Sequence, residues 1–402
     1  MALISVAEAL DRVLAHAAPL PSEQVALDDA LGRVLAADLK ALRTQPPADL
    51  SAMDGYAARA ADVATAPVAL RIIGEVAAGR PFTRAIGPGE AARIFTGGVM
   101  PAGADTVVVQ EITERCGDAV TVRKPVSQGR HIRRRGLDFQ RGDALFSAGR
   151  RLSARDLALL AGMNHPRLPL YRRPKLALFA TGDELVPPGQ EPGPGQIVYS
   201  NGFALAALAR QEGAAVVDLG LVKDELDATI AAIRGARGLA ADILVTTGGA
   251  SVGEYDLVHK AFAAEGMDLS FWKVAMRPGR PLMHGRLGGM HVLGLPGNPV
   301  SAYVCAFLFL VPLIRRLIGR SDWALPTESA LLGSDLPAND ERADYLRATL
   351  QEGGKGPIAT VFPIQDSSMM VPLAKADCLV IREPYALAAT AGSRCAIVKF
   401  ER

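Results

Sequence analysis

From Tyr171 onward, short apolar runs alternate with segments of helical spacing. The apolar runs are "KLALFA", "AAVVDLG", "DILVTT", "MDLSFWKVA" and "HVLGLPG", and between them lie segments such as "NGFALAALARQEG". Near-continuous apolar strands separated by helices are typical of a parallel α/β sheet. We therefore predict an α/β domain over residues 173–325, with ligands at the carboxyl ends of its strands.

The remaining residues have different patterns. Residues 1–45 and 141–172, which include helical spacing from Leu27 to Leu42, predict two halves of one helical domain. Residues 46–140 are short apolar runs separated by Gly and Pro, and predict a small β domain inserted between those halves. Residues 326–402 predict a C-terminal β domain, a small sheet or barrel. The predicted fold class is a multidomain protein of α/β plus β type.

Composition narrows the class of protein. The chain has 402 residues, of which 49% are hydrophobic and 21% charged, as in a soluble protein with several cores. A net charge of +2 gives no strong field over the whole molecule, so we expect no nucleic-acid partner. The four cysteines are far apart and form no CxxC pair, which argues against a disulfide framework or a cysteine zinc site. A cytoplasmic location fits best.

No membrane segment is expected. The start "MALISVAEALDRVLAHA" has apolar residues at helical intervals with acids between them, unlike a signal peptide. The most apolar segment, Val300 to Ile314, is shorter than the roughly 20 residues that cross a bilayer, and it contains Pro312. We predict a buried helix there.

The strand "DILVTT" runs directly into the loop "GGASVGEYD". A loop between a strand and a helix offers free backbone N–H groups and the helix dipole to an anion. Gly248, Gly249 and Gly253 would let the backbone approach that anion closely. The loop matches neither GxxxxGK[ST] nor the dinucleotide fingerprint, and an ordinary glycine-rich turn is the alternative.

Carboxylates follow three neighbouring strands of the predicted sheet. They are Asp183 and Glu184 in "ATGDEL", Asp224 in "LVKDELD", and Glu254 and Asp256 in "VGEYD". Each by itself is explained as a helix cap or a partner of the helix dipole. Together, beside a loop suited to phosphate, they are what a divalent hard cation between protein and phosphate oxygens requires. The cluster therefore favours a metal site.

A basic turn and a rigid turn follow the next two strands. "FWKVAMRPGRP" presents Lys273, Arg277 and Arg280, which would offset the carboxylates and hold a tetrahedral oxyanion by forked hydrogen bonds. A solvated basic turn is the alternative. In "LPGNPVSA", Gly297 and its flanking prolines fix the backbone before a helix, as a rigid wall of the site.

Seven motifs in register resemble the molybdopterin molybdenumtransferases, the MoeA family that includes the E domains of gephyrin and its plant counterparts. The motifs are "SAMDGYA", "TGGVMPAGADTVVVQE", "IRRRGLD", "TGDEL", "TTGGASVGEYD", "FWKVAMRPGRP" and "GLPGNPVSA". The resemblance implies an elongated four-part protomer with a molybdopterin-binding-like α/β domain. It also implies a homodimer, in which the active cleft lies between this α/β domain and the inserted β domain of the other copy.

The resemblance implies a reaction as well. Molybdate is inserted into adenylylated molybdopterin, AMP is released, and Mg²⁺ is the expected metal. Further partners would be molybdopterin adenylyltransferase and molybdoenzyme acceptors. A molybdopterin adenylyltransferase and a gephyrin-like scaffold without catalysis are the alternatives. The two β domains argue against the first, and the full acidic set argues against the second.

Residue roles follow from the matched motifs. The expected catalytic residues are Asp54, Thr96, Asp138, Glu184, Asp256 and Lys273, and the expected metal ligands are Asp224 and Asp256. The expected substrate-binding residues are Arg133, Gly248, Gly249, Ser251, Gly253, Arg277, Arg280, Pro296, Gly297, Asn298, Pro299, Arg347 and Ser367. Arg277 and Arg280 stand where lysines are common in the family. Asp366 stands where a glycine is usual, so the sequence leaves open whether Ser367 or Ser368 is the matching serine.

Overall fold

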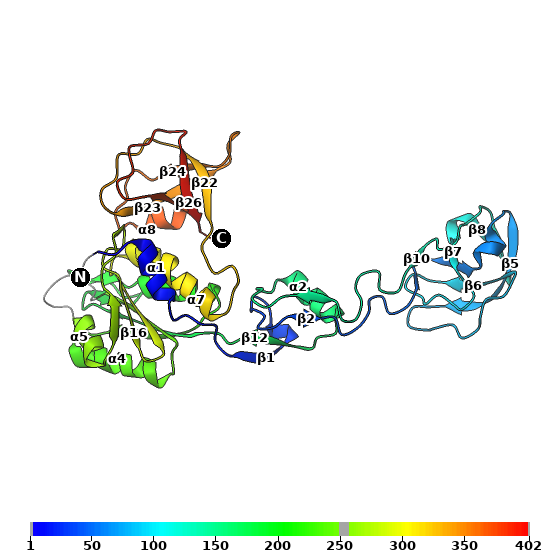
Figure 1. Ribbon diagram of the computed structural model, residues 1–402, viewed down its shortest axis with the longest axis horizontal. Helices are drawn as coiled ribbons and strands as arrows, with labels where there is room; N and C mark the ends of the chain where they lie inside the picture. The colour runs from blue at the N-terminus through cyan, green and yellow to red at the C-terminus, as the bar shows by residue number, and fades with distance from the viewer. Residues whose placement is uncertain (1–2, 249–256, 401–402) are drawn as a thin grey trace.

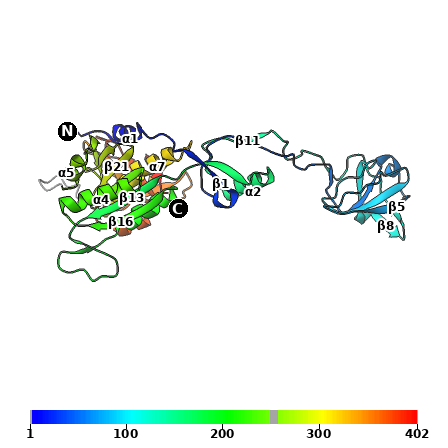
Figure 2. The same ribbon diagram turned by 90° about the horizontal axis from the view of Figure 1, so that it is seen from below.

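The computed structural model describes residues 3–248 and 257–400, and it is elongated (Figure 1). An α/β part and the C-terminal part lie together at one end, a narrow part lies in the middle, and a β part lies at the far end (Figure 2). In the narrow part, residues 22–51 run outward beside residues 132–171, which return. The β part is therefore an insertion, connected to the rest of the protein by two antiparallel segments of the chain.

A six-stranded sheet forms the centre of the α/β part, in the order β16-β13-β17-β21-β20-β18. The bounds are β13 Lys175–Thr181, β16 Ala215–Val222, β17 Ile243–Thr247, β18 Asp268–Phe271, β20 Met283–Leu287 and β21 Met290–Leu295. Strands β16, β13, β17 and β21 are parallel, whereas β20 is antiparallel to both of its neighbours. The predicted α/β fold is confirmed. The sequence analysis missed β20, although Gly288 and Gly289 between β20 and β21 are a hairpin signal.

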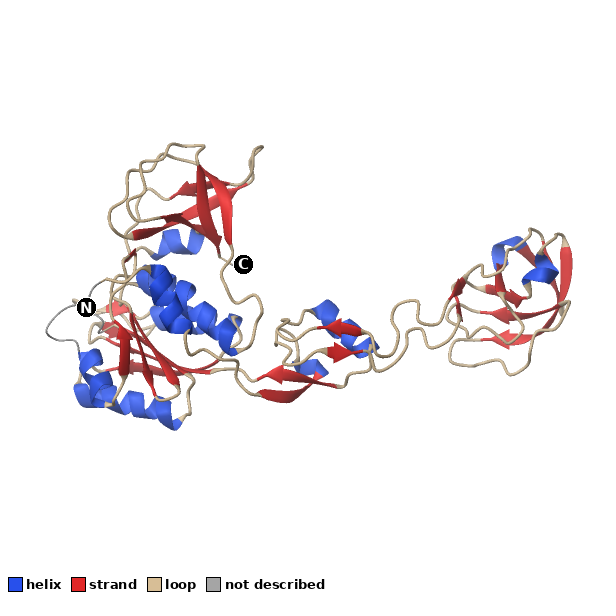
Figure 3. Ribbon diagram, in the orientation of Figure 1, coloured by secondary structure: helices blue, strands red, loops and turns tan. Residues whose placement is uncertain are grey.

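Helices cover both faces of this sheet (Figure 3). The bounds are α1 Val6–Leu14, α3 Asn201–Gln211, α4 Leu226–Gly238, α5 Leu257–Ala264, α6 Pro299–Cys305 and α7 Val311–Leu317. On β13, Leu176 and Leu178 pack in the cluster of α1, α3, α6 and α7, whereas Ala177 and Phe179 pack with α4 and α5. Because successive side chains of a strand point to opposite faces, the strand is apolar at every position from Leu176 to Ala180.

The run Pro299–Leu317 comprises α6, a π-helical turn over Ala306–Leu310, and α7. By length and composition it could cross a membrane, but 89% of its apolar window is buried inside the protein. It packs against α1, α3 and the sheet. The buried helix predicted from Val300 to Ile314 is confirmed.

The narrow middle part is mostly not helical. It contains the strand pairs β1 with β12, β2 with β11 and β3 with β10, and only one α-helix among its described residues. The bounds are β1 Ser22–Ala26, β2 Leu39–Lys40, β3 Leu50–Ser51, β10 Ile132–Arg133, β11 Ala144–Phe146, α2 Ala154–Gly162 and β12 Arg167–Tyr171.

The helix predicted from Leu27 to Leu42 is wrong. Within this segment, only the 3₁₀ turn Leu27–Asp29 is helical. Gly32 has φ +72°, which an α-helix does not allow. The apolar spacing instead reflects Leu35, in a β-bridge with Leu170, and Leu39 on β2, which pack in one cluster. The predicted N-terminal helix does form, as α1, but it packs on α7 in the α/β core.

The far part is a six-stranded sheet in the order β7-β4-β6-β5-β9-β8. Its elements are β4 Gly55–Ala58, η2 Ala60–Val63, β5 Val68–Val76, β6 Glu90–Ile94, β7 Thr106–Val109, η3 Gln110–Ile112, β8 Thr113–Cys116 and β9 Ala119–Val122. Two apolar clusters hold it together, one around Tyr56 and one around Ile94.

The C-terminal part is a closed β-barrel, because β23 pairs with both β24 and β25 in the order β23-β24-β22-β26-β25. Its elements are β22 Thr327–Leu332, β23 Ala343–Gln351, β24 Ile358–Val361, α8 Met370–Lys375, β25 Cys378–Arg382 and β26 Arg394–Lys399. The short strand β19, Met276–Arg277, leaves the α/β part and pairs with β23. The two parts are thereby joined by backbone hydrogen bonds.

Two buried histidines make the α/β part sensitive to acid. His284 on β20 and His291 on β21 are each 2% exposed, with ring centroids 5.9 Å apart. Burial lowers the pKa of His284 to about 3 and that of His291 to about 4. Below pH 6.5 the unfolded chain therefore binds more protons than the folded chain, and stability falls as the pH drops.

We expect the free energy of unfolding to be flat above pH 7. Between pH 6.5 and 4.5 it should fall by up to about 1.4 kcal/mol per pH unit for each of the two groups. In His284→Leu, urea midpoints measured across this range should show roughly half of the wild-type acid slope. An unchanged slope in the variant would contradict this prediction.

Candidate active site

The carboxyl ends of β13, β17 and β21 meet the C-terminal part around a cavity of about 450 Å³. Thr181 and Glu184 line it after β13, and Thr247 and Gly248 line it at the end of β17. The turn Gly297–Pro299 lines it after β21, and Ser368 and Met370 line it from the C-terminal part. A cavity at this edge of an α/β sheet is the expected place for a ligand.

The floor of this cavity is built by Thr181 and Gly248. Gly248 has φ +87°, and a Cβ atom at that position would lie 2.1 Å from the carbonyl oxygen of Thr181. Thr181 is 2% exposed, and its hydroxyl has no hydrogen-bond partner within residues 3–248 and 257–400. Since buried hydroxyls are nearly always hydrogen-bonded, this one is suited to a ligand atom. Gly249, Ser251, Gly253, Glu254 and Asp256 lie outside the described residues.

The acidic loops after β13 and β16 lie side by side. The backbone N–H of Asp224 donates to the Asp183 carboxylate at 3.4 Å, and both residues are exposed. Glu184 lines the cavity itself. The part of the chain that the structure describes holds no group of three His, Cys, Asp or Glu residues placed to bind a metal ion. The predicted metal ligand Asp256 falls outside that part.

Hydrogen bonds from two asparagine side chains link the walls of the cavity. Asn201 Nδ2 donates to the Gly297 carbonyl at 2.7 Å and to Thr247 Oγ1 at 3.3 Å. Asn298 Nδ2 donates to Ser367 Oγ at 2.8 Å, which joins the α/β part to the barrel part. The turn is therefore fixed from both sides.

Arg347 lies behind the serine loop. It is 1% exposed, and its Nη1 and Nη2 donate to the carbonyls of Met369 and Asp366 at 3.0 and 2.9 Å. Its Nε donates to Gln365 Oε1 at 3.1 Å. Arg347 thus shapes the loop that carries Ser367 and Ser368. Of these two serines, Ser368 lines the cavity, whereas Ser367 is bonded to Asn298.

The three basic residues of the turn differ in whether they form ion pairs within the protein. Arg277 Nε and Nη2 donate hydrogen bonds to the two carboxylate oxygens of Asp344 at 2.7 and 2.8 Å, and this pairing raises the pKa of Arg277. Its forked donors, which we predicted to hold an oxyanion, are therefore occupied, and they face a separate cavity of about 330 Å³. Lys273 and Arg280 form no ion pair with any described residue.

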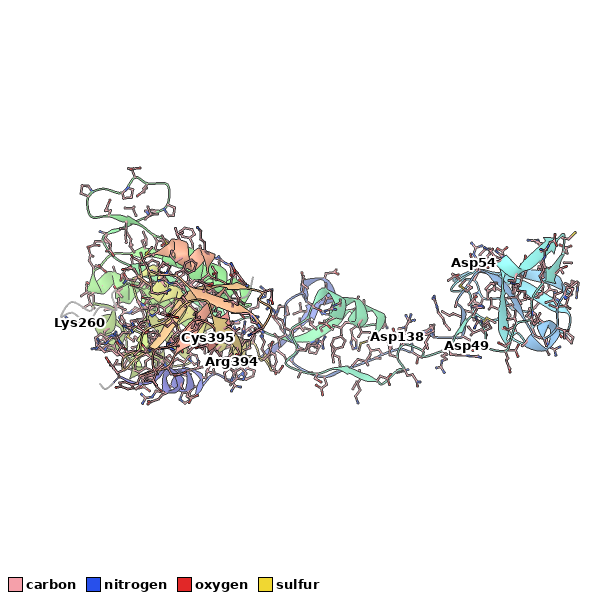
Figure 4. All side chains as sticks on the ribbon, turned by 90° about the horizontal axis from the view of Figure 1, so that it is seen from above. Asp49, Asp54, Asp138, Lys260, Arg394 and Cys395 are labelled. Atoms are coloured by element: carbon pink, nitrogen blue, oxygen red, sulfur yellow. The ribbon has the colours of Figure 1, made fainter. Side chains whose placement is uncertain are left out.

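The predicted residues of the inserted part lie far from this cavity. Thr96 donates to Asp54 Oδ1 from its N–H and its hydroxyl, both at 2.8 Å, and these bonds lower the pKa of Asp54. Figure 4 shows Asp54 in the far part and Asp138 in the narrow part, both separated from Arg394 in the barrel part. Arg133 lies on β10, in the same outlying region. Within one chain these residues do not reach the carboxyl edge of the sheet.

Three family models match consecutive regions. They are the MoeA N-terminal region (domain I and II) over residues 4–163, the probable molybdopterin binding domain over 177–316, and the MoeA C-terminal region (domain IV) over 329–400. A molybdopterin molybdenumtransferase of Haemophilus influenzae is 34% identical over 386 residues, 95% of each chain. The chain belongs to the MoeA family.

Other MoeA proteins are also similar to most of this chain. A molybdopterin molybdenumtransferase of Bacillus subtilis is 35% identical over 94% of this chain and 90% of its own length. Two crystal structures of a MoeA protein from Pyrococcus horikoshii superpose with TM-scores of 0.86 and 0.83. They are 30% and 28% identical and cover 100% and 99% of this chain, and 100% of their own chains.

Some cavity residues of this MoeA chain escaped the sequence analysis. Tyr199 and Ser200, directly before α3, and Asn201, its first residue, line the cavity. They follow the short strands β14, Leu185–Val186, and β15, Ile197–Val198. The polar pair Ser-Asn at the start of a helix was the sequence signal for these residues. It was missed because the Gly- and Pro-rich segment before it has no strand pattern, so no strand end was predicted there.

Proposed function

We propose that this protein is a molybdopterin molybdenumtransferase, which inserts molybdate into adenylylated molybdopterin and releases AMP. The observation that carries this function is the floor of the cavity. There, at the strand ends beside Gly248, the buried Thr181 hydroxyl has no hydrogen-bond partner among the described residues and offers a place for a phosphate oxygen. The MoeA relatives that match nearly the whole chain have this activity in their names.

We also propose that the working form is a homodimer in the cytoplasm. Asp54 and Thr96 form a hydrogen-bonded pair on the inserted part, far from the cavity of their own chain. A second copy, placed so that its inserted part covers the cavity, would bring that pair to the site. The same arrangement would bring Asp138 and Arg133 close to the substrate. The adenylyltransferase and the molybdoenzymes that take the product remain expected partners.

We propose that a magnesium ion binds at the rim. Mg²⁺ is commonly held by one or two carboxylates together with substrate phosphates and water. Asp224 and Asp256 would hold it here, and it would neutralise charge on the pyrophosphate. Lys273 and Arg280, which have no described ion-pair partner, would attract molybdate to the same edge. Electrostatic stabilisation then dominates, and no protein nucleophile is needed.

The function is tested by incubating the purified protein with adenylylated molybdopterin. AMP release that requires molybdate is the expected result. Consumption of ATP in the absence of molybdate would instead identify an adenylyltransferase. A dimer that binds peptide but releases no AMP would identify a scaffold.

The Thr181 hydroxyl gives a sharper test. Thr181→Val keeps the shape of the side chain but removes the donor, so we expect KM for adenylylated molybdopterin to rise roughly tenfold or more, as for a lost hydrogen bond to a charged group. The urea midpoint should stay the same or rise, because the buried hydroxyl that is removed has no hydrogen-bond partner in the described parts of the chain.

Thr246→Val is the matched control. Thr246 is fully buried on β17, its hydroxyl also has no partner among the residues described, and it does not line the cavity. The KM of Thr246→Val for adenylylated molybdopterin should equal that of the wild type. Equal KM values for all three proteins would exclude Thr181 from phosphate binding.

A further inference from the structure

A second cavity, of about 670 Å³, lies beside the first one. It is enclosed by α3, α6 and α8, and by Phe400 near the end of the chain. Leu205, Ala302 and Leu373 contribute apolar surface, and the ring of Tyr303 meets that of Phe400 at 67° with centroids 5.8 Å apart. The cavity is thus apolar, partly aromatic and within the size range of small-molecule sites, about 300–1,000 Å³.

The two cavities adjoin each other. Ser200, Asn201, Pro299 and Met370 line both of them. A molecule with phosphates on the floor formed by Thr181 can therefore extend past the start of α3 and α6 into the second cavity.

The chemistry of the second cavity differs from that of the first. It offers apolar and aromatic walls, with few polar groups at its edge. Ser200 precedes α3, but its hydroxyl makes no capping bond to that helix, and Lys375 on α8 is exposed. Aromatic and apolar walls with a few hydrogen-bonding groups are suited to a flat nitrogen heterocycle.

We propose that this second cavity is the subsite for a flat bicyclic nitrogen heterocycle of the substrate, the adenine or the pterin. The inference rests on the proposed function, because that substrate has such a ring at each end and phosphates between them. The phosphates lie at the strand ends of the first cavity, and one ring lies between α3, α6 and α8.

Filling the cavity tests the proposal. Ala204 is an exposed residue of α3 that lines the second cavity only, so Ala204→Trp places an indole where the ring would lie. Ala207, also exposed on α3, lines neither cavity, and Ala207→Trp is the matched control. We expect KM for adenylylated molybdopterin to rise at least tenfold in Ala204→Trp, with kcat changed much less, and to remain at the wild-type value in Ala207→Trp.

Two binding probes identify the ring. The affinities of AMP and of 6-hydroxymethylpterin are measured for the folded wild type and both variants. Weaker binding of AMP by Ala204→Trp assigns the cavity to adenine, and weaker binding of the pterin assigns it to the pterin. Wild-type affinity of Ala204→Trp for both probes overturns the proposal. An inactive wild-type protein would instead count against the proposed function, and the probe affinities would still decide the subsite.

Discussion

Mixed dimers of two inactive variants, Asp54→Asn and Glu184→Gln, are expected to recover about half of the wild-type rate of AMP release. Each variant alone should lose about 100-fold or more, because each lacks a charged group at the proposed site. In a mixed dimer, one site combines both substitutions, whereas the other combines the intact Asp54 of one copy with the intact Glu184 of the other. One of two sites is then complete.

The measurement uses two affinity tags on co-expressed variants, so that only mixed dimers are purified. Dimers of each variant, tagged and purified in the same way, are the controls. If the site were formed within one chain, both copies of the mixed dimer would be defective. No recovery above the single variants would therefore rule out the shared cleft.

The second large effect concerns the stability of the α/β part. Glu212, at the end of α3, is 3% exposed and accepts hydrogen bonds from two buried arginines. Arg315 on α7 binds it at 2.7 and 2.8 Å, and Arg320 binds it at 3.2 Å. Glu212→Ala leaves this buried positive charge without its carboxylate, and we expect a loss of about 3–5 kcal/mol in the free energy of unfolding.

Urea unfolding followed by tryptophan fluorescence measures this loss. The two tryptophans of the chain, Trp272 and Trp323, lie in or beside the α/β part, so the signal reports this region. Glu225→Ala is the control, since Glu225 is exposed and lies 4.0 Å from the Lys223 ammonium in a surface pair. That control should change stability by less than about 1 kcal/mol. Equal midpoints for the two variants would show that the buried charges contribute little.

Much of the α/β part could be predicted from the sequence because its signals are local. Residues 243–247 are buried at every position, and residues 243–245 are apolar, since both faces of β17 are covered; Gly248 stands where a side chain would collide with Thr181. The error from Leu27 to Leu42 has the opposite origin. There, Leu35 and Leu39 are apolar because of neighbours distant in the chain, such as Leu160 and Leu168, and the resulting spacing only resembles that of a helix.

The roles of the arginines could not be predicted, since they depend on partners far away in the sequence. Arg277 is part of a basic turn in the sequence, but its pairing with Asp344 follows from the meeting of β19 and β23. Likewise, Arg347 on β23 donates to carbonyls of the loop that carries Ser367 and Ser368, and it only supports the cavity.

By itself, the sequence determined the parallel α/β fold, the buried helix after Pro299 and the family, because hydrophobic periodicity and short motifs are properties of neighbouring residues. Only the tertiary structure decided which polar groups share a cavity and which are neutralised elsewhere. It also placed Asp54 in the far part and Glu184 at the cavity of the α/β part. The reason is physical: a hydrogen bond or an ion pair acts over a few ångströms, and only the packing of distant segments brings two groups that close.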